Sequence, residues 1–123
     1  MITEKYVSFE TAKLLKEKGF DWECFFCWDN VTETNRISSL MVCSNKELVE
    51  HYYAMPTLQM AMKWLRVEKN WFVQIQIQND GTYIGYIYRT DGFPYVGWDK
   101  RRVKETSEEA CEAAIKYCLE NLI

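Results

Sequence analysis

The sequence is short of the residues that build most reactive centres. Its one histidine, His51, has only Glu47 as a nearby partner, so a metal or acid–base role there lacks converging groups. Its five glycines are scattered and form no phosphate-binding loop. Its carboxylates are spread over the expected helix surfaces, where solvation explains them. The sequence therefore predicts no catalytic residue, no metal ligand and no cofactor.

Long apolar runs are also absent. The longest notable run, Phe25–Trp28, is far too short to cross a bilayer. The N-terminal residues MITEKYVSFETAK have neither the apolar centre nor the small-residue cleavage site of a signal peptide. We therefore expect a cytoplasmic protein that has no membrane partner.

The five cysteines are an odd number, which fits poorly with a complete set of disulfides. Cys24 and Cys27 have the CxxC spacing of zinc and redox sites, but their flanks look like a strand, on which residues three apart point to opposite faces. Cys111 and Cys118 share the apolar side of an expected helix. We expect free thiols that pack in the core.

The composition is that of one folded domain covering residues 1–123. Hydrophobic residues make up 48% of the chain and aromatic residues 15%, which is ample material for a core. The 15 basic and 18 acidic side chains leave a net charge of −3, which disfavours a general nucleic-acid binder.

Three helices are signalled by their ends. In the first, Ser8 is suited to cap the start and Gly19 to stop the end of residues 11–18. Thr57 is suited to cap a second helix with an apolar stripe from Leu58 to Leu65. In the third, Thr106 and Glu109 form a capping box, and the expected buried side is Cys111, Ala114, Ile115, Cys118, Leu119 and Leu122.

Strands are expected between these helices. Residues 22–28 and 36–43 suggest one hairpin, and residues 95–98 suggest a short strand. Residues 45–53 are ambiguous, because residues 46–50 fit a short helix and residues 51–53 fit an extended segment. The element order predicts an α+β fold, with an antiparallel sheet of about four to five strands and three helices packed mainly on one face.

The clearest element is a hairpin over residues 71–88, in which apolar residues alternate with glutamines. If Asp80-Gly81 is a two-residue turn, Ile77 pairs with Ile84. The expected buried face is then Val73, Ile75, Ile77, Ile84, Tyr86 and Tyr88. The other face carries Tyr83, Gly85, Ile87 and the glutamines.

One group of residues combines aromatic and basic side chains. Tyr95, Trp98, Arg101, Arg102 and Lys104 are candidate binding residues, because aromatic rings stack on bases and cations hold phosphates. We expect the two arginines to project outward at a junction between a strand and a loop. Acidic neighbours dilute the positive field, so core-lining aromatics beside a solvated charge run remain the competing interpretation.

The chain also resembles a group of small proteins from gut Bacteroidetes and their phages and mobile elements. The resemblance lies in FETAKLLKEKGFDW, in LQMAMKWLRVEKN with the Tyr53–Thr57 residues before it, and in TSEEACEAAIKYCLENLI. These matching segments contain helix caps and core positions and no catalytic residue. The resemblance implies a bacterial or phage cytoplasm and carries no activity.

The leading functional hypothesis is a non-enzymatic interaction or accessory module that binds a protein partner or itself. It is based on a good core, many aromatic residues and no catalytic set. The alternative is a small nucleic-acid-associated protein that uses the Tyr95–Lys104 surface. A second alternative is an enzyme with a carboxylate site that the sequence does not reveal.

Overall fold

A computed structural model of the chain describes residues 6–24, 26–29, 34–37, 45, 52–90, 95–96 and 102–123. The chain forms two compact units, Met1–Thr57 and Leu58–Ile123. The α+β class is confirmed. The predicted single sheet is not what these residues form, because their strands divide into a three-stranded and a four-stranded sheet. In the described part of the chain, no helix is both long and apolar enough to cross a membrane.

The first unit combines one helix with a small antiparallel sheet. Its elements are α1 (Phe9–Glu17), β1 (Phe26–Asp29), β2 (Thr34–Ile37) and β3 (Tyr52–Ala54). The strand order is β2-β1-β3, with both neighbours antiparallel to β1. The predicted hairpin is therefore confirmed in its pairing, and among the described residues β1 extends to Asp29 and β2 begins at Thr34.

Local signals set both ends of α1, as predicted. The Ser8 hydroxyl oxygen accepts a hydrogen bond from the Thr11 backbone N–H at 3.3 Å. At the other end Gly19 has a φ of +94°, and the Phe20 N–H donates to the Leu15 carbonyl at 2.9 Å. The chain reverses here, and Phe20 is buried.

Asn45 ties two parts of the first unit together. Its side-chain amide donates to the Phe20 carbonyl at 2.9 Å, and its oxygen accepts from the Ala54 N–H at 2.9 Å. The extended conformation considered for residues 51–53 is confirmed for Tyr52 and Tyr53, which lie in β3, and the short helix considered for residues 46–50 lies outside the described residues. His51 and Glu47 lie outside the described residues.

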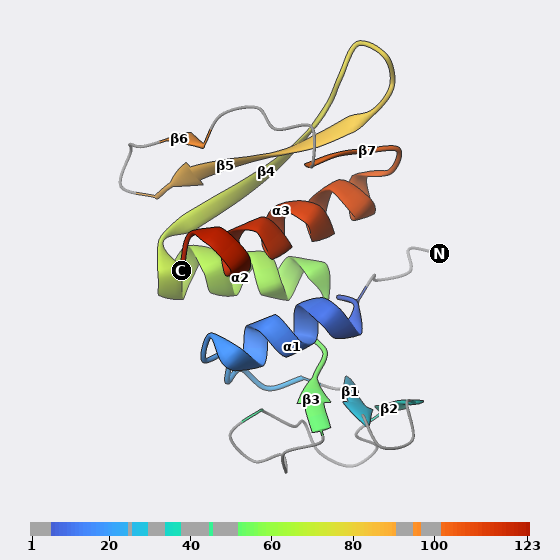
Figure 1. The fold of residues 1–123 in the computed structure, drawn as a ribbon, viewed down its shortest axis with the longest axis vertical. Helices are drawn as coiled ribbons and strands as arrows, with labels where there is room; N and C mark the ends of the chain where they lie inside the picture. The colour runs from blue at the N-terminus through green and yellow to red at the C-terminus, as the bar shows by residue number, and fades with distance from the viewer. Residues whose placement is uncertain are drawn as a thin grey trace. The chain divides into compact units, whose positions relative to one another are not determined.

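The second unit packs two helices against a four-stranded antiparallel sheet. Its elements are α2 (Leu58–Lys69), β4 (Trp71–Ile77), β5 (Tyr83–Arg89), β6 (Tyr95–Val96), β7 (Val103–Lys104) and α3 (Ser107–Asn121). β5 pairs with β4 on one edge and with both β6 and β7 on the other. Figure 1 shows α2 and α3 on the same side of the β4–β5 hairpin.

The predicted register of this hairpin is wrong by one residue. Ile77 pairs with Tyr83, and Ile75 pairs with Gly85. Gly85 and Ile87 therefore share a face with the alternating apolar residues of β4, the reverse of the prediction. Ile84 lies on the opposite face and is also fully buried, so β5 is buried on both sides.

The reason is the length of the turn. The Gln78 N–H donates to the Thr82 carbonyl at 2.7 Å, so the loop contains three residues, 79–81, in place of two. Gly81 alone has a positive φ, +86°. This is the three-residue loop that ends in a left-handed glycine. The Asp80 carboxylate accepts from the Thr82 hydroxyl and N–H, which lowers the pKa of Asp80.

α3 begins as predicted and presents the predicted face. The Thr106 hydroxyl oxygen accepts from the Glu109 N–H at 3.1 Å, and the Glu109 carboxylate accepts from that hydroxyl at 3.0 Å. Among the side chains expected to be buried on this helix, only Leu122 is half-buried instead. Its buried residues are Ala110, Cys111, Ala114, Ile115, Cys118 and Leu119.

Gly85 allows α3 to approach β5 very closely. A Cβ atom placed on Gly85 would lie 2.5 Å from the Cβ of Ala114 and 3.0 Å from the carbonyl oxygen of Ala110. The small residues of the helix therefore pack directly onto the strand backbone. No larger residue fits at position 85 without a shift of the helix.

We expect Gly85→Ala to lower the free energy of unfolding by about 1 to 3 kcal/mol, because the added methyl group overpacks this contact. Urea denaturation measures the change. Adding Ala114→Gly removes the opposing methyl group, so the double variant should be more stable than the sum of the single effects predicts. Simple additivity of the two substitutions would contradict the close approach.

Candidate interaction surface

The five residues predicted to form a basic and aromatic surface do not come together as one exposed patch in the described structure. Arg102 is only 1% exposed, whereas Lys104 is exposed on β7. Tyr95 belongs to β6, where its backbone pairs with Tyr88 of β5. Trp98 and Arg101 lie outside the described residues.

The expectation that Arg102 projects outward is wrong, because its side chain completes an edge of the sheet. On that edge of β5, Tyr83 pairs with β7 and Ile87 pairs with β6. Gly85 lies between these two short pairings, and its carbonyl accepts a hydrogen bond from the Arg102 Nη1 at 2.6 Å. The guanidinium thus supplies the donor that a continuous neighbouring strand would supply.

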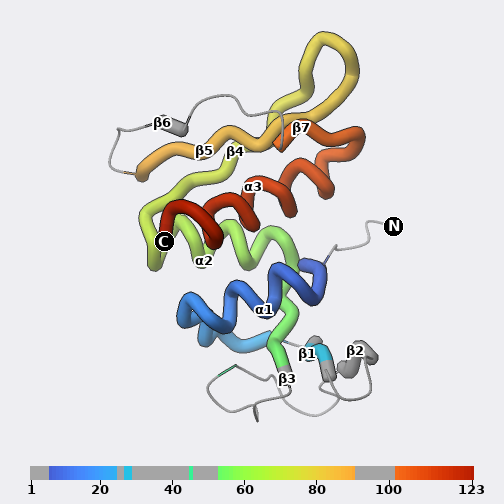
Figure 2. The backbone as a smooth tube through the Cα atoms, in the orientation of Figure 1, coloured from blue at the N-terminus to red at the C-terminus, as the bar shows by residue number. Residues whose placement is uncertain are grey.

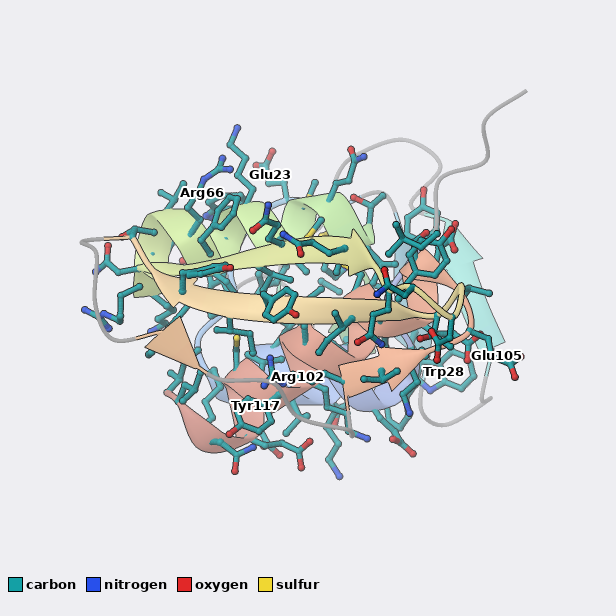
Figure 3. The ribbon with its side chains drawn as sticks, turned by 90° about the horizontal axis from the view of Figure 1, so that it is seen from above. Glu23, Trp28, Arg66, Arg102, Glu105 and Tyr117 are labelled. Atoms are coloured by element: carbon teal, nitrogen blue, oxygen red, sulfur yellow. The ribbon has the colours of Figure 1, made fainter. Side chains whose placement is uncertain are left out.

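Tyr117 of α3 covers the same guanidinium. The carbon atom at its centre lies 5.1 Å from the centre of the Tyr117 ring, a cation–π contact. Figure 3 shows the two side chains next to each other beneath the sheet. Sequence reasoning missed this role, because a charged residue in a basic run is normally solvated.

Arg102→Ala should lower the free energy of unfolding by about 2 kcal/mol or more, because it leaves the buried Gly85 carbonyl without this charged donor. Lys104→Ala is the matched control. Lys104 is exposed two residues away, and its loss should change stability by less than about 0.5 kcal/mol. Denaturant titration compares them, and equal effects would argue against a structural role for Arg102.

None of the described cysteines is in a disulfide, and all of them are buried. Burial raises the pKa of Cys111 to about 12, and the carboxylates of Glu112 and Glu108 add to the shift. Burial also raises the pKa of Cys118 to about 12, although the charge of Arg102 acts in the opposite direction.

Cys24 and Cys27 both lie in the core of the first unit. Among the described residues, no three His, Cys, Asp or Glu side chains are grouped to hold a metal ion.

Cys111 and Cys118 should react with iodoacetamide at pH 8 only when the protein unfolds. A pKa of about 12 leaves almost no thiolate at that pH, and thiolate is the reactive form. Mass spectrometry after timed labelling, with and without urea, measures both sites. Rapid labelling of either site in the native protein would contradict this expectation.

β4 has an edge to which no described strand is paired. The backbone groups of Asn70 and Gln78, which flank β4, bond to Thr90 and Thr82 across the hairpin. Bonding alternates along an antiparallel pair, so the even-numbered residues of β4 face β5. The N–H and C=O groups of the odd-numbered residues, from Trp71 to Ile77, point toward the other edge.

The residues of β4 lack the features that usually protect a sheet edge. Trp71–Ile77 contains no charged residue, no proline and no glycine. Ile77 is 66% exposed and Phe72 is 38% exposed. Figure 2 shows the turn of the hairpin extending beyond α2 and α3, which leaves the Ile77 end of the strand uncovered by these helices.

Sequence reasoning did not identify this edge as a site. The available signal was the uncharged run from Trp71 to Gln78, which was interpreted only as a strand with a polar outer face. Whether a strand lies at the edge of a sheet depends on its neighbours, and the sequence does not show them. No protein-family model, curated protein or solved structure matches the chain.

Proposed function

We propose that this protein is a non-enzymatic interaction module of a bacterial or phage cytoplasm, and that β4 is its binding element. The observation that carries the proposal is the uncharged edge of β4, to which no strand of the described residues is paired. An edge of this kind presents a row of backbone donors and acceptors ready to pair with another strand.

Two properties support this choice over the other functions considered. Exposed Ile77 and Phe72 add apolar area beside the backbone groups, so a bound strand gains hydrophobic as well as hydrogen-bonding contacts. The buried thiols and the buried Arg102 both serve the fold. Of the basic side chains predicted to bind nucleic acid, Lys104 alone is exposed in the described structure.

Ile77→Lys should abolish partner binding and leave the fold intact. A lysine on an edge strand discourages pairing, and the exposed position tolerates the change. The measurement is affinity capture from the native host with the unsubstituted protein and the variant, followed by quantitative mass spectrometry. A thermal melt of the same proteins confirms that both are folded.

Val67→Lys is the control. Val67 is 54% exposed on α2, so this substitution adds the same charge at a similarly exposed apolar position and leaves β4 neutral. Proteins captured by the unsubstituted chain and by Val67→Lys, but lost with Ile77→Lys, support the proposal. A capture profile that Ile77→Lys does not alter would reject β4 as the binding element.

A further inference from the structure

The surroundings of the β4 edge indicate what kind of partner fits there. α2 contacts β4 and lies along it on the side away from β5, as Figure 3 shows. A second copy paired edge to edge would bring its own α2 to the same place beneath the joined strands. A single extended segment brings no helix, so it requires no accommodation beside α2.

The charges beside this edge indicate the chemistry of the segment. Figure 3 shows Arg66 projecting from α2 on the side of β4 opposite β5. Lys63 lies three residues earlier on the same face of the helix and is also exposed. β4 itself is uncharged, so Arg66 and Lys63 give this face of α2 a basic character next to a neutral strand.

We infer that the β4 edge binds an extended segment of a partner protein that is apolar at alternate positions and acidic near its end. The segment adds a strand to the sheet through the outward backbone groups of Trp71, Val73, Ile75 and Ile77. Its apolar side chains, which share one face of the added strand, cover the exposed Ile77 on the side of the sheet that faces the helices, and its carboxylate meets Arg66. This inference depends on the proposed function, because it names the occupant of the same edge.

The test uses two synthetic peptides of seven residues, the length of β4. Both alternate valine and threonine; one has glutamate at both ends and the other has lysine. Each is titrated into the ¹⁵N-labelled protein, and amide hydrogen exchange is followed by NMR. We expect slower exchange at Trp71, Val73, Ile75 and Ile77, because these amides become hydrogen-bonded to the added strand.

The charge of the peptide should set its affinity. A partly exposed ion pair contributes up to about 1 kcal/mol, so the glutamate peptide should bind about two- to fivefold more tightly than the lysine peptide. Arg66→Glu should reverse that order without changing which amides are protected. Ile77→Lys should weaken the binding of both peptides. Val67→Lys should leave the protection of the β4 amides by both peptides intact, because Val67 lies outside β4.

Three results would overturn the inference. One is that neither peptide protects these amides at a peptide concentration of about 1 mM, because binding with a Kd below that concentration would occupy most of the protein. Another is an affinity that is the same for both peptides. The third is a dimer in sedimentation velocity whose β4 amides are protected without peptide. That last result would show that a second copy binds the β4 edge, so the inference about the segment would fail while β4 would remain the binding element of the proposed function. A capture profile that Ile77→Lys does not change would reject both the proposed function and this inference.

Discussion

Gly85 is the point at which β5 and α3 come closer than any side chain would allow. The missing Cβ lets Ala110 and Ala114 pack on the strand backbone, and Arg102 bonds to the Gly85 carbonyl from the adjacent edge. One residue therefore positions the helix against the sheet and the buried guanidinium against the strand. The register set by the three-residue loop places this glycine on the face that α3 covers.

The two edges of the sheet in the second unit are treated differently. Along β5, short pairings with β6 and β7 and the Arg102 side chain satisfy the backbone between them. Along β4, the corresponding groups have no described strand beside them. Folding thus completes one edge by burying a charge, and among the described residues it leaves the other edge without a paired strand. This asymmetry is the physical basis for assigning binding to β4.

Helix ends were predictable because their signals are local. Ser8 caps the start of α1 and Gly19 follows its end, while Thr106 caps the start of α3. Each of these signals acts through hydrogen bonds to residues nearby in the sequence. The existence of the β4–β5 hairpin was equally clear from its alternation. Its register was not, because Asn-Asp-Gly accommodates a two-residue or a three-residue loop and the choice depends on what packs against each face. The short strand expected at residues 95–98 is confirmed at Tyr95–Val96, whereas β7, two residues long, carries no periodicity to detect.

By itself, the sequence determined the α+β class, the caps of α1 and α3, the burial of its α3 cysteines and the lack of any charge along residues 71–78. These depend on the order of neighbouring residues. Tertiary structure alone decided that Arg102 is buried, that Gly85 faces a helix and that β4 is an edge strand. Each of these depends on contacts between residues far apart in the chain, and the free energy of such contacts is set by packing that local propensity does not encode.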